Sequence, residues 1–385
     1  MTNNIINKIG IVICSPREID IYKNLFKKLP DKKYNLLIND LSSSNFDKLK
    51  IIKITKYLKN ICFLSSIYKK KKYSLILSTG EIDNYKVSIY SFFRFAYAIT
   101  IGNLIECTIL KKIFIKIFKK PLSAGGFNCN LGLPWYPERD LGVKTVKFPD
   151  GADVKLKIYP ENIHKIVFDF FLYLTDYEGK KLQQKISKTK IKKITYLRYL
   201  NSKKNKFNFT LNFKNQKFDE KKKIIYWLPT YINTFGEKNK NIELWIPRLL
   251  FLRKFYNLII RPHPRTLLED PSFKKKLIFN NLIIDDKLNQ ENNILIQSSD
   301  IIFCDYGGSV FSSIFLKKPV ILLNLSNNST FVKSLNQIDS LDMIVRSNLI
   351  NLDLTSNENK IYISVKKCLS KNYRNIIYKS KKKIF

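Results

Sequence analysis

Short apolar segments alternate with helical stretches along the first half of the chain. Lys8–Ser15 (KIGIVICS) has the pattern of a buried strand, and helical periodicity follows it over Arg17–Lys28. Tyr34–Asn39 and Tyr73–Ser78 are further apolar runs that are bounded by polar residues. Short apolar runs separated by helical segments are typical of βα units and a parallel sheet. The first half therefore predicts a Rossmann-like domain.

The same pattern restarts after a polar stretch, Lys180–Gln216, which is rich in Lys, Asn and Gln. Further strands are expected at the short apolar runs Ile224–Leu228, Asn257–Arg261, Leu282–Asp285, Ile301–Asp305 and Val320–Leu325. Helices are expected over Glu243–Phe255, Val310–Leu316 and the basic tail Ile361–Phe385. The second half thus predicts another parallel sheet.

Two tandem parallel sheets predict an α/β chain of two Rossmann-like domains that face a cleft, the glycosyltransferase-B (GT-B) type. We expect an N-terminal domain over 1–200, a C-terminal domain over 215–355, and a basic C-terminal helix over 356–385 that is long enough to cross back. Parallel sheets of this kind bind ligands at the carboxyl ends of their strands. The site is therefore expected in the cleft between the domains.

The charge of the chain is strongly basic, with 69 Lys and Arg against 31 Asp and Glu and a net charge of +38. Only ten of these cations are Arg, the residue on which sequence-specific nucleic-acid recognition depends most. The many Lys accompany many Ile and Asn, as an AT-rich genome would produce. The excess charge suits an anionic partner, either a phosphorylated substrate, a nucleotide or an acidic membrane face, and no nucleic-acid partner is predicted.

The six cysteines are scattered and form no Cys-x-x-Cys pair, and no histidine lies at a ligand spacing from them. This pattern predicts no metal, no disulfide framework and a reducing compartment. The apolar N-terminal run Ile9–Cys14 is too short for a signal peptide. The most apolar part of the chain is Val87–Phe118, and its longest uncharged run, Phe95–Ile105, is about half as long as a membrane-spanning helix needs to be. The sequence predicts a cytoplasmic protein.

A first candidate site lies where the expected strand Ile301–Asp305 meets the next helix. Asp305 ends the strand, Gly307 and Gly308 permit close backbone approach, and Ser309 is expected to cap the helix. The exposed N-terminus of such a helix has free amides and a partial positive charge that bind phosphate. An ordinary tight βα turn has the same pattern, so this alternative stays open.

A second candidate site is Arg261-Pro262-His263-Pro264-Arg265, directly after another expected strand. The prolines fix the backbone around one of only two histidines in the chain, and two of the ten arginines flank it. A histidine between two arginines suits a phosphate or diphosphate group. The arginine charges favour a neutral imidazole that donates a hydrogen bond. A surface turn is the alternative.

The ordered series IIYWLPT (ending at Thr230), RPHP and DYGGS followed by KKPVILLNL resembles the C-terminal half of the CDP-glycerol glycerophosphotransferase family, the teichoic-acid primases and polymerases. The resemblance covers roughly residues 224–324. It implies that His263 and the loop Asp305–Ser309 bind the diphosphate of a CDP-linked donor. Thr230, Arg261 and Arg265 are expected to bind the same donor beside them. Gly307 and Gly308 stand where that family has paired serines.

The resemblance is fainter in the N-terminal half, where that family has a His-Gly element whose histidine acts as base. The comparable segment here is VKFPDG, which ends in Asp150-Gly151, and Ile166–Leu172 resembles the strand that follows it in the family. Asp150 would then be the general base, a role that a carboxylate can fill. Asp-Gly followed by a later His-Pro also resembles bacterial sialyltransferases, which use CMP-sugars. An ordinary turn is the alternative for Asp150.

A third feature is the segment Cys107–Lys120, in which apolar residues at helical spacing oppose five lysines. This is the pattern of a basic amphipathic helix, which either packs on a core or attaches to an anionic membrane surface. The tail Lys379–Lys383 would assist such attachment. Peripheral association with the inner face of the cell membrane would suit a lipid-linked acceptor.

These features together predict a transferase, and they involve no cofactor. The enzyme would move glycerol phosphate, or a related polyol phosphate or sugar, from a CDP- or CMP-linked donor to a cell-surface glycan or lipid-linked acceptor. One alternative is an enzyme similar to UDP-GlcNAc 2-epimerases, which share the GT-B fold and a Ser-Gly-Gly helix start. That family needs further carboxylates beside its nucleotide, and Val310–Leu316 contains none. The other alternative is a non-catalytic basic binding protein.

Overall fold

The computed structural model describes most of the C-terminal half of the chain and a smaller share of the N-terminal half. The described residues are 5–13, 16–26, 28–38, 60–63, 72–79, 138, 141–152, 156–157, 159–160, 162–199, 207–213, 216–231, 241–263, 266–267, 270–286, 292–325 and 330–385. The segment Cys107–Lys120 and Arg265 lie outside these residues. No helix in the described part is long and apolar enough to span a membrane.

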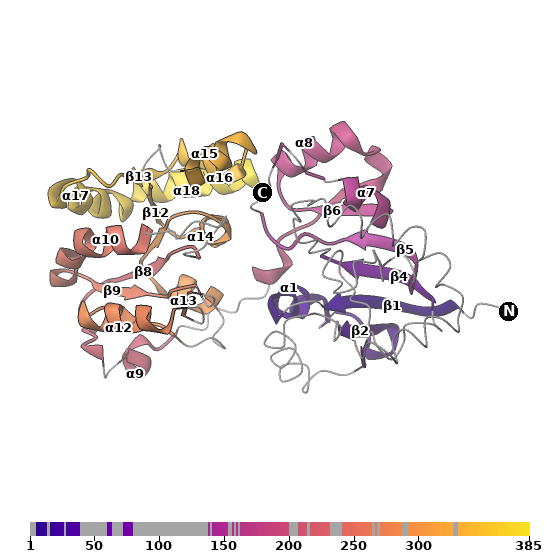
Figure 1. Ribbon diagram of the computed structural model, residues 1–385, viewed down its shortest axis with the longest axis horizontal. Coiled ribbons are helices and arrows are strands. Elements are labelled where there is room, and N and C mark those ends of the chain that lie inside the picture. Colours follow the sequence, from indigo (N-terminus) through magenta and orange to yellow (C-terminus); the bar gives the residue numbers. More distant parts are fainter. Residues whose placement is uncertain are drawn as a thin grey trace, which may run out of the picture. The chain divides into compact units, whose positions relative to one another are not determined.

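The N-terminal sheet has seven parallel strands in the order β3-β2-β1-β4-β5-β6-β7 (Figure 1). The strands are β1 (Ile5–Ile13), β2 (Tyr34–Ile38), β3 (Ile61–Phe63), β4 (Lys72–Ser78), β5 (Gly142–Lys147), β6 (Phe170–Tyr173) and β7 (Ile191–Lys193). Helices α1 (Pro16–Phe26), α7 (Asn162–Val167) and α8 (Asp176–Lys185) belong to the same part of the chain. Side chains of β1, β2 and α1 form a buried core with Phe148.

The C-terminal sheet has six parallel strands in the order β10-β9-β8-β11-β12-β13. The strands are β8 (Ile224–Leu228), β9 (Asn257–Ile260), β10 (Ile283–Ile284), β11 (Ile301–Cys304), β12 (Val320–Leu323) and β13 (Ile350–Leu352). The helices among the described residues of this part are α9 (Phe209–Phe213), α10 (Asn241–Leu249), α12 (Pro271–Phe279), α13 (Asn292–Ser298), α14 (Gly308–Phe315), α15 (Thr330–Gln337), α16 (Leu341–Arg346), α17 (Glu358–Cys368) and α18 (Lys371–Ile384). Strands β9, β11 and β12 are buried at every residue, which explains their continuous apolar sequences.

Both sheets have the strand order of a doubly wound fold. Numbered within its own sheet, each follows the order 3-2-1-4-5-6, and the N-terminal sheet adds a seventh strand. The order in which strands are added across the sheet therefore reverses between β1 and β4 in one sheet and between β8 and β11 in the other. The predicted α/β fold with two parallel sheets is confirmed.

Contacts along the chain divide it into two compact units. The first contains residues 1–150, 160–173 and 182–200, and the second contains residues 151–159, 174–181 and 201–385. The second unit thus includes two short segments, 151–159 and 174–181, from the first half of the sequence. One of them is tied to the loop before α16, where the amide of Leu156 donates to the carbonyl oxygen of Asp339 at 3.2 Å.

Several elements differ from the expectation. The predicted strand Ile166–Leu172 begins only at Phe170, because residues through Val167 belong to α7. The polar stretch Lys180–Gln216 contains the edge strand β7, whose two lysines are exposed and leave no apolar pattern to detect. The basic tail forms two helices, α17 and α18, which Ser370 separates by capping α18 through the amide of Tyr373.

Helix α18 packs on the sheet of its own unit. The hydroxyl of Tyr373 donates to the carbonyl oxygen of Val320 at 2.6 Å and accepts from the amide of Ile350 at 3.0 Å. The ammonium of Lys381 donates to the carbonyl oxygen of Phe315 at 2.6 Å, at the end of α14. The tail is therefore joined to β12, β13 and α14.

Candidate functional site

The reversal point of the C-terminal sheet carries two of the predicted motifs. Strands β8 and β11 are hydrogen-bonded neighbours there, with Leu228 opposite Cys304 at their carboxyl ends. Thr230 follows β8 and Asp305 follows β11 directly. In doubly wound sheets, ligands bind beyond the carboxyl ends of the strands at this reversal point. The position of the two motifs is therefore that of a ligand site.

Asp305 connects the carboxyl ends of β8 and β11 through hydrogen bonds of its side chain. Its carboxylate accepts a hydrogen bond from the amide of Thr230 at 2.7 Å and from its neighbour Tyr306 at 2.8 Å, and the residue has no exposed surface. A buried carboxylate that already holds two amides has no donor to offer a phosphate. Asp305 therefore shapes the loop, in place of the direct phosphate contact that we expected from it.

The two glycines that follow have different roles. Gly307 has φ +92° and ψ −167°, a conformation that is almost confined to glycine, and it is the residue before the first turn of α14. Gly308 begins the helix, and a Cβ added to it would meet no heavy atom within 4 Å. The space over Gly308 is therefore open to an approaching group.

Ser309 lies inside the first turn of α14, so its predicted role as helix cap is wrong. The cap residue is Gly307, which has no side chain to accept from the helix amides. Gly308 and Ser309 are both partly exposed, whereas Val310, Phe311 and Ile314 are buried. First-turn amides have no acceptor within a helix and suit an anion. The start of α14 thus presents amides and the Ser309 hydroxyl at the surface.

His263 follows the neighbouring strand β9. Its imidazole lies 5.5 Å from the ring of Tyr231, measured between ring centroids, and Tyr231 follows Thr230 after β8. Pro262 is buried, while His263 is partly exposed. Because β9, β8 and β11 are consecutive in the sheet, His263, Thr230 and the start of α14 lie on three adjacent strand ends.

Arg261 does not present a free cation at this edge, contrary to our expectation. Its guanidinium donates to the carboxylate of Asp285 at 3.1 Å, and the two side chains are 12% and 0% exposed. The hydroxyl of Tyr226 donates to the same carboxylate oxygen at 2.8 Å. Burial raises the pKa of Tyr226 well above its ordinary value, against the charge of Arg261. This buried group ties β8, β9 and the residue after β10 together.

Two residues of α16, Asp342 and Arg346, contact the turn Asp305–Gly307. Neither was singled out from the sequence. The carboxylate of Asp342 accepts from the amide of Gly307 at 3.0 Å. The guanidinium of Arg346 lies over the ring of Tyr306, 3.9 Å from its centroid. It also donates to the carbonyl oxygen of Asp305 and to the side-chain oxygen of Asn324, at the end of β12.

The predicted base Asp150 belongs to the N-terminal unit, where it follows β5 and is partly exposed. The amide of Phe148 donates to the carbonyl oxygen of Ser78 at 2.7 Å, which extends the pairing of β5 with β4. The ring of Phe148 packs 4.9 Å from that of Tyr22 on α1. Asp150 therefore follows a firmly held strand end.

A second polar group lies at the carboxyl ends of β1, β4 and β5. Glu18 accepts from the hydroxyl of Thr79, Glu138 accepts from the hydroxyl of Ser78 at 2.8 Å, and the ammonium of Lys147 donates to the carbonyl oxygen of Thr79 at 2.7 Å. All five residues are buried. They hold the strand ends of the N-terminal sheet together.

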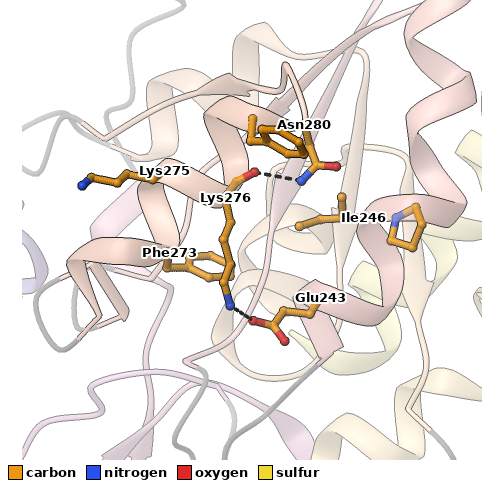
Figure 2. A pocket seen from close by; sticks show the side chains of 8 residues that line it. Glu243, Ile246, Phe273, Lys275, Lys276 and Asn280 are labelled. Carbon is orange, nitrogen blue, oxygen red and sulfur yellow. Dashed lines mark hydrogen bonds and ion pairs between the residues drawn. The ribbon is translucent and has the colours of Figure 1, made fainter.

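No predicted site residue lines the hollow between α10 and α12, which has a volume of about 680 Å³ (Figure 2). The ammonium of Lys276 and the carboxylate of Glu243 close one side of it at 2.9 Å, and Phe279 is 86% exposed. Among the described residues, no three His, Cys, Asp or Glu side chains are grouped as ligands for a metal ion.

No protein-family model matches the chain, and no curated protein matches it either. Solved structures do. A histidine-to-asparagine variant of the wall teichoic acid polymerase TagF soaked with CDPG is 13% identical, with a TM-score of 0.53 over 98% of this chain and 84% of that chain. The chain has the GT-B fold. A second TagF structure is 12% identical, with a TM-score of 0.51 over 96% and 82% of the two chains. The UDP-GlcNAc 2-epimerase from Methanocaldococcus jannaschii is 16% identical, with a TM-score of 0.49 over 94% and 93%.

Proposed function

We propose that the protein transfers glycerol phosphate, or a related polyol phosphate or sugar, from a CDP- or CMP-linked donor to a glycan or lipid-linked acceptor. One observation carries the proposal: Thr230, His263 and the start of α14 lie on three adjacent strand ends at the reversal point of the C-terminal sheet. The cytidine nucleotide follows from the resemblance of IIYWLPT, RPHP and DYGGS to the CDP-glycerol glycerophosphotransferases. The likeness in fold to the TagF polymerase agrees with it.

The donor side uses neutral hydrogen-bond donors and the dipole of α14. The amides of Gly308 and Ser309, the two hydroxyls of Thr230 and Ser309, and the imidazole of His263 would hold the phosphates. Arg261 and Asp305 act on this group indirectly, by holding β8, β9 and the turn. Arg265 remains a candidate phosphate ligand on the sequence pattern alone, since it lies outside the described residues.

The acceptor side uses Asp150 as base. The acceptor hydroxyl oxygen attacks the phosphorus that carries the polyol, its proton passes to the Asp150 carboxylate, and the bond to the second phosphate breaks, which releases CMP. With a CMP-linked sugar the oxygen attacks the anomeric carbon, and CMP again leaves. CMP is thus the common product of both versions of the reaction.

The test is a donor panel in which liberated nucleotide is measured. Incubation with CDP-glycerol, a CMP-linked sugar and UDP-GlcNAc, each with a lipid and glycan extract as acceptor source, should release CMP from one of the first two. Epimerised UDP-GlcNAc without CMP release would instead assign the epimerase reaction. No turnover of any cytidine donor would contradict the proposal.

Asp150→Asn separates the base from the donor site. The amide keeps the shape of the side chain but cannot accept the proton, so kcat should fall by about 10²–10⁴-fold. The Kd for CDP should stay within about two-fold of wild type, because the donor ligands belong to the other unit. Turnover above about a tenth of wild type would show that Asp150 is a turn residue.

We also propose that the exposed side of α18 binds an anionic membrane surface. The helix carries six cations and no acidic residue, and these are Lys371, Arg374, Lys379, Lys381, Lys382 and Lys383. Ile376 and Tyr378 are 38% and 41% exposed among them. The ammonium groups of Lys317 and Lys382 lie 4.8 and 4.7 Å from the ring centroid of Tyr378. Exposed apolar side chains among lysines suit an anionic lipid surface.

Vesicle sedimentation tests this surface. The triple change Lys379, Lys382 and Lys383 to Glu should release the protein from phosphatidylglycerol vesicles at low salt. The matched control changes Lys188, Lys190 and Lys192, exposed on the other unit, to Glu and should leave binding unchanged. Equal loss in both variants would reduce the effect to net charge, and wild-type protein that ignores the vesicles would refute the membrane proposal.

A further inference from the structure

The polar groups of the turn Asp305–Gly307 are committed to protein partners. The carboxylate of Asp305 holds the amides of Thr230 and Tyr306, the carbonyl oxygen of Asp305 accepts from Arg346, and the amide of Gly307 donates to Asp342. These amides are therefore not available to a ligand. The next backbone amides along the chain are those of the first turn of α14. Their direction depends on the conformation of the turn that precedes them.

Helix α16 reaches the turn from a distant part of the sequence. Asp342 is 35 residues beyond Gly307, and Arg346 is 41 residues beyond Asp305. Asp342 lies in the first turn of α16, where the cap Ser340 accepts from its amide at 3.3 Å and where a carboxylate is favoured by the helix dipole. Both residues are buried, at 4% and 7% exposure.

The buried charged groups around the turn are two carboxylates and one guanidinium, so their role is to hold the turn and not to attract an anion themselves. Asp305 and Asp342 put two carboxylates behind the start of α14, and each would repel a phosphate. The guanidinium of Arg346, which is stacked on Tyr306 and bonded to the carbonyl oxygen of Asp305, offsets one of them. Its planar fork joins the ends of β11 and β12 through Asp305 and Asn324, which a lysine cannot reproduce.

We infer that Asp342 and Arg346 are positioning residues, which fix the Asp305–Gly307 turn so that the first amides of α14 face the donor phosphates. The inference rests on the proposed function for the identity of the anion. It predicts that removing the Asp342 carboxylate frees the Gly307 amide and lets the start of α14 change direction. It further predicts that an amide oxygen at the same place restores the contact.

Two measurements test this on the 385-residue chain. Amide exchange of residues 305–312 should accelerate roughly ten-fold in Asp342→Ala, and the Kd for CDP should rise about ten-fold, the equivalent of one hydrogen bond. Asp342→Asn, which keeps an oxygen for the Gly307 amide, should stay near wild type in both measurements. Arg346→Lys gives a second variant, expected to weaken CDP binding although the charge is kept, because the stack and the fork are lost.

Asp300→Ala is the matched control. Its carboxylate also accepts from a backbone amide, that of Ile224 at 2.8 Å, but at the amino end of β8. The control should lower stability without changing exchange of residues 305–312 or the Kd for CDP. Exchange in Asp342→Ala equal to wild type, or equal to Asp300→Ala, would overturn the inference whatever the ligand. Failure of wild-type protein to bind CDP, with local exchange still raised in Asp342→Ala, would refute the proposed donor and leave the positioning role standing.

Discussion

Gly307→Ala is the sharpest stability test of the turn that begins α14. Gly307 has φ +92° and ψ −167°, and the nearest atom to an added Cβ is the Thr230 hydroxyl oxygen at 3.9 Å. Space is thus sufficient, and the cost is purely conformational. A non-glycine residue held in this region costs about 1–3 kcal/mol, so the free energy of unfolding should fall by that amount.

Gly308→Ala is the matched control one residue further on. An added Cβ meets nothing within 4 Å, and the residue is helical, where alanine is favoured over glycine by up to about 1 kcal/mol. The free energy of unfolding should therefore stay the same or rise slightly. The methyl group would still occupy the open space over the start of α14, so binding of CDP should weaken in a protein that is as stable as wild type.

Urea unfolding at equilibrium measures both effects, with the denaturant slope as a check that the transition is unchanged. Gly307→Ala as stable as wild type would show that the turn is not held in its left-handed conformation. Gly308→Ala less stable than Gly307→Ala would contradict the assignment of Gly307 as the residue before the helix. Unchanged CDP binding in Gly308→Ala would place the nucleotide elsewhere.

Two further predictions concern buried groups. Asp285→Ala leaves the Arg261 guanidinium buried without its carboxylate, so the free energy of unfolding should fall by about 3–5 kcal/mol. Combining Asp285→Ala with Arg261→Met removes the unpaired charge and should recover part of this loss. A double variant that is no more stable than Asp285→Ala alone would refute this. Burial raises the pKa of Tyr373 above its ordinary value near 10, so the folded state keeps its proton longer, and stability that is complete below about pH 10 is lost as pH rises toward the folded pKa. Tyr373→Phe should lose less stability than wild type between pH 9 and 11.5 in urea titrations, and an equal loss would show that this hydroxyl does not titrate on unfolding.

The sequence was sufficient to predict the strands that are buried at every residue, such as β9, β11 and β12. Ile301–Cys304 and Val320–Leu323 are continuous apolar runs whose ends coincide with a polar residue or a proline. Short edge strands gave no such signal: Ile191–Lys193 has two exposed lysines, and Ile61–Phe63 is only three residues long. The inner strand Gly142–Lys147 has two exposed residues and was not predicted either, so local pattern detects fully buried strands better than partly exposed ones.

The candidate site was predictable only where it is local in sequence. Thr230, His263 and the glycines follow strand ends, which sequence shows. The partners of Arg261 and the Gly307 amide are 24 and 35 residues away, so neither the Asp285 ion pair nor the Asp342 contact leaves a trace in the local pattern. The prediction for Ser309 was wrong for a local reason, since Gly307, which has a positive φ, is the cap residue two positions earlier.

Calorimetric titration of the protein with CDP, CMP and UDP shows whether it binds a cytidine nucleotide in preference to a uridine nucleotide. We expect CDP to bind, and to bind more tightly than UDP. His263→Ala should weaken CDP binding by about ten-fold, the equivalent of one hydrogen bond to phosphate. His164 is the other histidine of the chain and lies in α7 of the N-terminal unit, so His164→Ala should leave the Kd for CDP unchanged. Binding of UDP without CDP or CMP, or equal CDP affinity in wild type and His263→Ala, would contradict this expectation.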